Sequence, residues 1–315
     1  MLIMKRRNLA VLRALVGLAV LFGAVTTAAA QAIIVDHTCA RLDPVPAEAV
    51  QRARETLHIA YGHSSHGSQI VQGMQALVAF MDAKKADPFP DNAFAFNHGG
   101  AGGALDLRDR PFSGATDLGN PNRTAWSAAT RSYLAAHPET NVIVWSWCGQ
   151  VAGSEADIDA YLAQMSALER DFPAVRFVYM TGHLAGTGVA GKVNVRNNQI
   201  RAYCRDNGKI LYDFADIESY DPDGLINYME RRANDACDYD SDGDGTRDRN
   251  WATEWQASHV QGVDWFDCRA AHSQPLNGNR KAYAAWWLWA RLAGWAGPET
   301  TTGTPSPSIA PSPPR

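Results

Sequence analysis

The sequence carries little excess charge of either sign, and this limits what it can bind. It has 29 Lys and Arg residues against 33 Asp and Glu residues, for a formal net charge of -4. The basic residues form no cluster after residue 30. Because nucleic-acid binding depends on a concentrated basic surface, we expect no nucleic-acid partner.

Long hydrophobic runs are lacking outside the N-terminus. Residues 1–30 combine a basic triplet at 5–7, an apolar stretch and a run of small residues that includes Ala30 and extends to Ala32. This order is typical of a secretory signal peptide, with cleavage after one of these two alanines. We therefore expect a secreted or periplasmic protein with no stable membrane anchor after cleavage. The alternative is an uncleaved anchor.

Cysteine is scarce, at five residues in 315. In an exported protein disulfides can form, but an odd count leaves at least one cysteine unpaired within the chain. We expect Cys237 to pair with Cys268, because these two cysteines flank one irregular segment. The alternative is that they are buried thiols, which is common for cysteine.

Apolar runs and helical patterns alternate along most of the chain. The expected strands are 57–61, 141–147, 176–182 and 210–217; the expected helices are 70–85, 122–137, 154–172, 194–208 and 280–295. Residues 91–107 predict a short strand that runs into a glycine-rich turn. Strands separated by helices predict an α/β fold with a mainly parallel sheet covered on both faces. We assign this domain to residues 31–297 and expect a disordered tail, rich in Pro, Ser and Thr, at 298–315.

In such a fold, functional side chains follow the carboxyl ends of the strands. The segments at these positions are 62–66, 97–100, 148–150 and 181–183. Together they are rich in hydroxyl, imidazole and amide groups and in glycine. Acyl transfer needs a nucleophile, a base and oxyanion donors, and these segments supply all three kinds of group.

The turn after the first expected strand offers Ser64 and Ser65 as nucleophiles. A serine between a strand and a helix gains from the free N–H groups at the helix start; the alternative is a serine that only caps the helix. His272 precedes the closing helix and is placed to reach across to the nucleophile as a general base. Asp267 or Asp264 could orient its imidazole. The alternative for His272 is a surface or capping residue.

The order of these segments resembles the SGNH (GDSL-type) hydrolase superfamily. Residues 62–64, Gly-His-Ser, stand where that pattern has Gly-Asp-Ser, and the glycines after 97 offer Gly99 or Gly102 as a backbone donor. Gln150 stands near the place of an Asn, and His272 ends a block before the last helix. The resemblance covers residues 55 to 295.

This resemblance implies a flavodoxin-like three-layer α/β/α sandwich and an esterase or carbohydrate deacetylase activity. It implies Ser64, or its neighbour Ser65, as nucleophile, His272 as base and Asp267 as its partner, with Gly99, Gly102 and Gln150 around the oxyanion. The chain departs from the pattern at His63 and Arg269, where the superfamily has Asp. The expected substrate is an acylated carbohydrate or another small ester.

An independent signal lies at 237–251. The spacing D-x-D-x-D-G-x-x-D matches the first nine positions of a calcium-binding loop and resembles loops of dockerins and thrombospondin-type repeats. The expected ligands are Asp240, Asp242, Asp244, Asp248 and the backbone carbonyl of Thr246. We expect a structural calcium ion and no organic cofactor; the alternative is a solvated acidic turn.

Two other functions fit the same residues. The chain could be a non-catalytic carbohydrate-binding or cell-surface protein with a degenerate SGNH fold. It could also be a metal-dependent hydrolase that uses His63 and His66, with His98 or His183 as a third ligand, although the motif H-E-x-x-H is absent.

Tryptophan is abundant, with ten residues, and aromatic faces stack on sugar rings. The tryptophans of the closing helix, within 286–289, are expected in the core. Trp251, Trp255 and Trp265 are expected in loops near the site, where they could form a wall for a carbohydrate.

Overall fold

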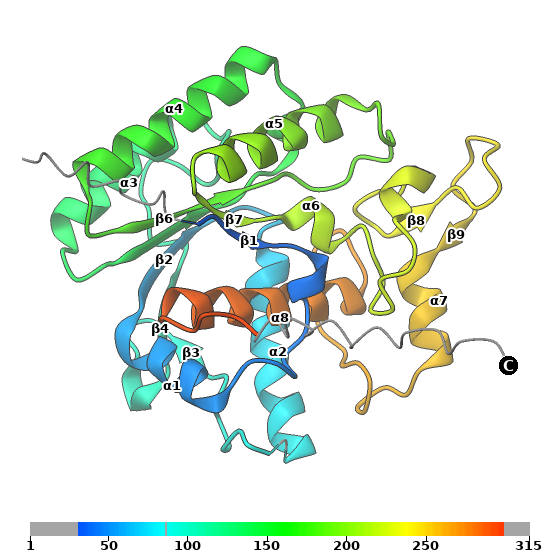
Figure 1. The fold of residues 1–315 in the computed structure, drawn as a ribbon, viewed down its shortest axis with the longest axis horizontal. Helices are drawn as coiled ribbons and strands as arrows, with labels where there is room; N and C mark the ends of the chain where they lie inside the picture. Colours follow the sequence, from blue (N-terminus) through cyan, green and yellow to red (C-terminus); the bar gives the residue numbers. More distant parts are fainter. Residues whose placement is uncertain (1–30, 86, 299–315) are drawn as a thin grey trace, which may run out of the picture.

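A central sheet of seven strands organises the computed structural model, which describes residues 31–85 and 87–298. All of its strand pairs are parallel, in the order β1-β7-β6-β5-β2-β4-β3. The strands are β1 (Ile33–Val35), β2 (His58–Gly62), β3 (Phe96–Asn97), β4 (Leu105–Asp109), β5 (Val142–Trp145), β6 (Arg176–Met180) and β7 (Ile210–Tyr212). The short antiparallel pair β8 (Asp238–Tyr239) and β9 (Arg249–Asn250) lies apart from this sheet (Figure 1).

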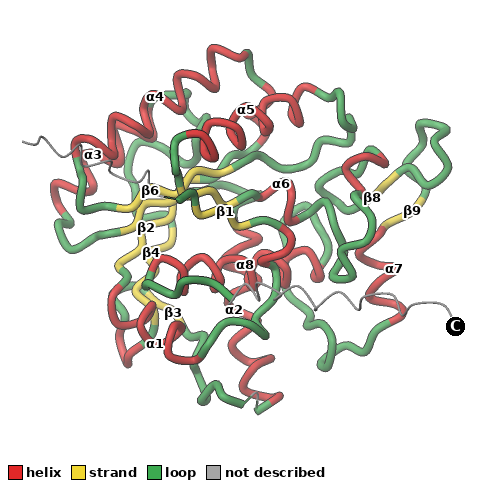
Figure 2. Tube along the Cα trace, in the orientation of Figure 1, coloured by secondary structure: helices red, strands yellow, loops and turns green. Residues whose placement is uncertain are grey.

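Helices cover both faces of the sheet (Figures 1 and 2). They are α1 (Ala47–Thr56), α2 (Ser68–Lys84), α3 (Ala125–Ala136), α4 (Glu155–Asp171), α5 (Lys192–Asp206), α6 (Phe214–Ile217), α7 (Trp251–Ser258) and α8 (Pro275–Leu292). One apolar core joins the sheet to α1, α2 and α8, and a second joins it to α3, α4 and α5. The expected three-layer α/β/α sandwich, flavodoxin-like in its layers and parallel strands, is therefore confirmed.

The connections on the two sides of β2 place the site. After β2 the chain runs toward β4 and β3 at one edge of the sheet, and it then returns to form β5 on the other side of β2. In open parallel sheets, the crevice at such a reversal, outside the carboxyl ends of the strands, is the usual binding position. The turn after β2 and the segment after β5 meet there.

The sequence located most elements but not the edges of the sheet. The strands at β2, β5 and β6 and the helices α2 to α5 and α8 lie where they were expected, and Ser154 forms the capping box of α4 with Asp157. The prediction for 210–217 was wrong in its second half. There Asp213 accepts a hydrogen bond from the backbone of Asp216 and starts α6. Strands β1 and β4 and helix α1 were not predicted from the sequence.

The expected disulfide between Cys237 and Cys268 is also wrong, because all five cysteines are free thiols. The sulfur of Cys237 lies 3.3 Å from the hydroxyl of Ser273. Cys268 instead lies beside Pro275 and Asn279, at 3.4 Å from a polar atom of each. The alternative of buried or half-buried thiols is the correct one.

Tryptophans fill the core more than the surface. Trp286, Trp287 and Trp289 of α8 are 0–5% exposed, which confirms the expectation for the closing helix. Trp251 is only 1% exposed, and its ring stacks near Tyr228, so its assignment to a substrate wall was wrong. It instead anchors a small apolar core beneath the segment that carries β8, β9 and α7.

Within the described part of the chain, no helix has both the length and the apolar character needed to cross a membrane. The expected signal peptide at 1–30 and nearly all of the expected tail at 298–315 lie outside the described residues.

Helices α2 and α8 cross in close contact at two glycines. A Cβ atom placed on Gly73 would lie 2.1 Å from the carbonyl oxygen of Gly278, and one on Gly278 would lie 2.8 Å from the sulfur of Cys268. The helices therefore pack backbone to backbone. Since α2 begins at the turn after β2 and α8 begins just after His272, this crossing fixes the two ends that face the site.

We expect Gly73→Ala to lower the free energy of unfolding by about 1–3 kcal/mol, because the added methyl overpacks the crossing despite the better helix propensity of alanine. Ala79→Ser, on the exposed side of α2, adds one atom without a contact and serves as the control. Urea denaturation measures the free energies of unfolding. Equal stability of Gly73→Ala and wild type would contradict the close crossing.

Candidate functional site

A histidine, an aspartate and a cysteine from three segments meet at the carboxyl edge of the sheet. His66 lies in the turn between β2 and α2, Cys148 follows β5, and Asp235 lies just before β8. Nε2 of His66 lies 2.8 Å from Oδ2 of Asp235, and Nδ1 lies 3.5 Å from Sγ of Cys148. The imidazole thus joins a carboxylate to a thiol, which is the arrangement of a nucleophile, a base and an orienting acid.

The turn that carries His66 is held tightly against the end of β5. A Cβ on Gly67 would lie 2.2 Å from the hydroxyl of Ser146, so only glycine allows this approach. The hydroxyl of Tyr61 donates to the carbonyl of Gly67 at 2.9 Å. His66 is 7% exposed as a result, whereas Cys148 remains half-buried beside it.

The pKa shifts of Cys148, His66 and Asp235 each favour the charged form of the group. Burial raises the pKa of the Cys148 thiol, but hydrogen bonds with Ser65, His66 and Ser64 outweigh burial, and the net shift is downward. Burial lowers the pKa of His66, but Asp235 and Cys148 raise it above its ordinary value. Burial also raises the pKa of Asp235, and its hydrogen bond with His66 reverses that shift. These directions favour a thiolate beside an imidazolium, the reactive form of a cysteine nucleophile.

The two serines of the turn have different partners. Ser64 donates its hydroxyl to Oδ2 of Asp117 at 2.6 Å, and Ser65 places its hydroxyl 3.4 Å from the sulfur of Cys148. His63 pairs through Nε2 with Asp109 at 2.5 Å, and its Nδ1 lies 2.9 Å from the carbonyl oxygen of Ser64. Through these hydrogen bonds His63 links the turn to the end of β4. This contact gives a structural role to the residue that stands where the SGNH pattern has Asp.

His272 comes to the site beside His66. Its ring packs against that of His66, with the centroids 4.6 Å apart. Among the described residues, no hydrogen bond joins its side chain to Ser64 or Ser65. Its backbone is in the left-handed region, at a φ of 64°, which is costly for a histidine. Because such a backbone persists only when its surroundings hold it, the segment around His272 fixes the ring beside His66.

No hydrogen bond or ion pair joins Asp267 or Asp264 to His272. The side chain of Asp267 is exposed, and Asp264 accepts a hydrogen bond at 2.8 Å from the backbone of Val260 in its own loop. The aspartate that orients an imidazole here is Asp235, and its partner is His66.

The expected oxyanion residues separate into two groups. Gly99 and Gly102 follow β3, whose last residue pairs with the second residue of β4, so they lie at the amino end of the central strands. The N–H of Gly99 already donates to Asp106 at 2.8 Å. The assignment of these two glycines was therefore wrong, because β3 ends one strand length short of the site. Gln150 does lie at the site, where its side-chain oxygen accepts from the N–H of Cys148 at 3.1 Å.

His183 completes a stack of three imidazoles. Its ring is parallel to that of His66, at 3.8 Å between centroids and 2° between planes. Its Nδ1 lies 2.7 Å from the carbonyl of Leu184, and burial lowers its pKa, which favours the neutral form of this ring beside His66.

His66, His183 and Asp235 have ligand atoms within 4.8 Å of one another and could hold a metal ion. Two imidazoles that bind one ion point their in-plane lone pairs at it. Stacked parallel rings do not converge in this way. The geometry thus favours acid–base chemistry over metal binding, and His63 and His98 are not part of this cluster.

A buried ion pair supports the segments around the site. Nζ of Lys281 lies 2.8 Å from Oε2 of Glu218, and the two side chains are 0% and 1% exposed. Lys281 also donates to Gln69 and Asn277, each at 2.9 Å. Gln69 in turn holds the carbonyl of Ala271 at 2.6 Å, next to His272.

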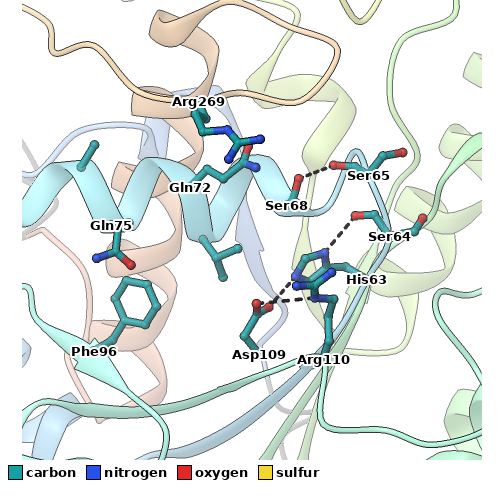
Figure 3. Close-up of a pocket in the computed structure, with 12 residues that line it drawn as sticks. His63, Ser64, Ser65, Ser68, Gln72, Gln75, Phe96, Asp109, Arg110 and Arg269 are labelled. Carbon is teal, nitrogen blue, oxygen red and sulfur yellow. Dashed lines mark hydrogen bonds and ion pairs between the residues drawn. The ribbon is translucent and has the colours of Figure 1, made fainter.

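A cavity of about 850 Å³ opens on one side of the serines. Figure 3 shows its walls: α2 with Gln72 and Gln75, the turn with Ser64 and Ser65, and side chains that come from β4 and from the segment before α8. The cavity is the size of a typical ligand site and gives a ligand access to the edge of the turn that carries Ser64 and Ser65.

The acidic loop at 237–251 keeps part of its expected cluster. Asp240, Asp242 and Asp244 converge within 4.8 Å, whereas Asp248 is not in this group and accepts hydrogen bonds from Ser241 instead. Asp240 is 5% exposed. The side chains of the other two converging aspartates are exposed.

Comparison with protein-family models, with curated proteins and with solved structures finds no match for this chain.

We expect iodoacetamide to alkylate Cys148 at a pH below that required for an ordinary thiol, because the pKa of this thiol is lowered. His66→Ala should move the alkylation profile of Cys148 to higher pH, since it removes a hydrogen bond and the nearby positive charge. Mass spectrometry of tryptic peptides across pH 5–10 measures the profile. Burial raises the pKa of Cys39 to about 11, so this residue is the internal control. A wild-type profile at or above that of free cysteine would contradict the thiolate–imidazolium pair.

Proposed function

We propose that this protein is a secreted hydrolase of acyl esters, acting by covalent acyl transfer, with an O-acylated carbohydrate as substrate. The observation that carries this proposal is the hydrogen-bonded series Cys148–His66–Asp235. A likeness to SGNH hydrolases remains part of the proposal. It is supported by the parallel sheet and by the positions of the Ser64 turn and of His272, before the last helix.

In the proposed reaction, the Cys148 thiolate attacks the carbonyl carbon of the ester and forms a thioester. The C–O bond to the sugar breaks, and the His66 imidazolium gives its proton to the departing oxygen. His66, now neutral, then takes a proton from water, and the resulting hydroxide attacks the thioester. The C–S bond breaks, the carboxylic acid leaves, and the thiolate–imidazolium pair is restored.

Gln150 and Asp235 support this chemistry in different ways. Because the side-chain oxygen of Gln150 accepts from the N–H of Cys148, its amide N–H groups remain to donate to the oxyanion. Asp235 holds His66 in orientation and stabilises its positive charge.

A serine nucleophile is the second candidate, favoured by the position of Ser65. Its hydroxyl lies 3.4 Å from the sulfur of Cys148, at the edge of the same cavity. In this version Cys148 only shapes the site, and His66 or His272 acts as base.

We expect Cys148→Ala to reduce kcat/KM for p-nitrophenyl acetate at least about 1000-fold, as loss of a nucleophile does. Ser65→Ala and Ser64→Ala, the matched controls, should retain activity to within about 10-fold. Mass spectrometry of the acid-quenched enzyme should find the acetyl group on Cys148.

Other outcomes decide between the alternatives. Labelling of Ser64 or Ser65 by a fluorophosphonate, with activity lost in that serine variant, would support the serine nucleophile. Glycan binding without turnover of any ester would contradict hydrolase function and support a non-catalytic binding protein.

We also propose a structural calcium ion in the acidic loop. The convergence of Asp240, Asp242 and Asp244 supports this, as does the positive φ of Gly245, which permits the sharp turn. The loop belongs to the same segment as Asp235, so an ion there would stabilise the segment that orients His66.

We expect millimolar calcium to raise the melting temperature by on the order of 5 °C relative to EGTA, because an ion that binds only the folded state stabilises it. Asp240→Asn should abolish this shift, whereas Asp206→Asn, on an exposed end of α5, should preserve it. Differential scanning fluorimetry measures the temperatures. An equal melting temperature in calcium and EGTA would contradict the ion.

A further inference from the structure

We propose that the cavity beside Ser64 and Ser65 recognises a carboxylate on the substrate, so that the substrate is an acylated acidic saccharide. This inference rests on the proposed hydrolase function and names its substrate class. It starts from the charges in the wall of the cavity, which the proposed reaction does not use.

Two arginines reach this cavity from separate segments. Arg110 follows β4, and Arg269 comes from the segment before α8, across the cavity near Gln72 (Figure 3). Arg269 forms no ion pair with any described residue, and its side chain is exposed. A guanidinium without a carboxylate of its own is prepared to bind one on a ligand, since its planar fork matches that group.

The single acidic residue in the wall does not cancel this charge. Asp109 is engaged on both oxygens: Oδ1 lies 2.5 Å from His63, and Oδ2 lies 3.6 Å from Nε of Arg110. Arg110 is therefore partly neutralised by Asp109, and Arg269 supplies the net positive charge. The cavity thus favours an anion at the end near Arg269.

The rest of the wall suits a sugar rather than a purely ionic ligand. Gln72 accepts from the backbone of Ala271 at 3.1 Å, which leaves its amide N–H groups free to donate to hydroxyls. Gln75 is exposed to the cavity, and Phe96 adds an apolar face against which a ring can lie. The volume of about 850 Å³ leaves room for more than one sugar unit.

The test compares two substrates that differ in one group: acetylated glucuronic acid and acetylated glucose. We expect wild-type kcat/KM to be roughly 10- to 100-fold higher for the acidic sugar, the usual effect of one charge-assisted hydrogen-bonded pair. Arg269→Gln should bring the ratio near one while p-nitrophenyl acetate hydrolysis is unchanged. Arg205→Gln, which removes an exposed charge at the end of α5, should keep the wild-type ratio.

Binding gives a second measurement that does not need turnover. Calorimetry on Cys148→Ala should show binding of glucuronate but not glucose, and Arg269→Gln in that background should abolish it. Equal rates for the two sugars, or a preference that survives in Arg269→Gln, would overturn the inference. Binding of glucose 6-sulfate as tight as that of glucuronate would also overturn it, because the site would then recognise any negative charge and not a carboxylate in particular. If the wild-type protein does not hydrolyse p-nitrophenyl acetate, that result would instead contradict the proposed function.

Discussion

The buried ion pair between Lys281 and Glu218 is the constraint on which the geometry of the site depends. A charge taken out of water is strongly unfavourable unless every partner is in place. Lys281 finds its partners on α2 and within α8, and Glu218 also accepts from the backbone of Leu184, the residue after His183. Because Gln69 extends the network to Ala271, the segments that carry His66, His183 and His272 are positioned by one electrostatic requirement.

The sheet and this network of buried polar groups position different parts of the site. Parallel strands bring the turn after β2 and the segment after β5 to a common edge, which accounts for the meeting of His66 and Cys148. The glycine crossing of α2 and α8 then fixes the angle at which the two helix starts approach each other. Asp235 lies in a long segment between α6 and α7, so the acid of the series is held beside a small apolar core distinct from the two cores that pack on the sheet.

The sequence predicted the layers and the buried strands because long apolar runs and helical spacing are local signals. It also identified the turn at 62–67, Gln150 and the approach of His272. It could not predict Asp235, since that residue sits in an irregular segment 169 positions from His66, and no local pattern links them. It misplaced Gly99 and Gly102 because β3 is only two residues long, and the length of an edge strand is set by tertiary pairing. Cys148 was visible after β5, but only its contact with His66 gives it a role.

The left-handed backbone of His272 has a consequence for the energetics of the whole chain. At a φ of 64°, glycine would be the residue of lowest energy, and a histidine there stores strain of about 1–3 kcal/mol. The residue is exposed to solvent, and its imidazole packs against the ring of His66. The chain thus carries this local cost in stability at the point where the ring of His272 packs against that of His66.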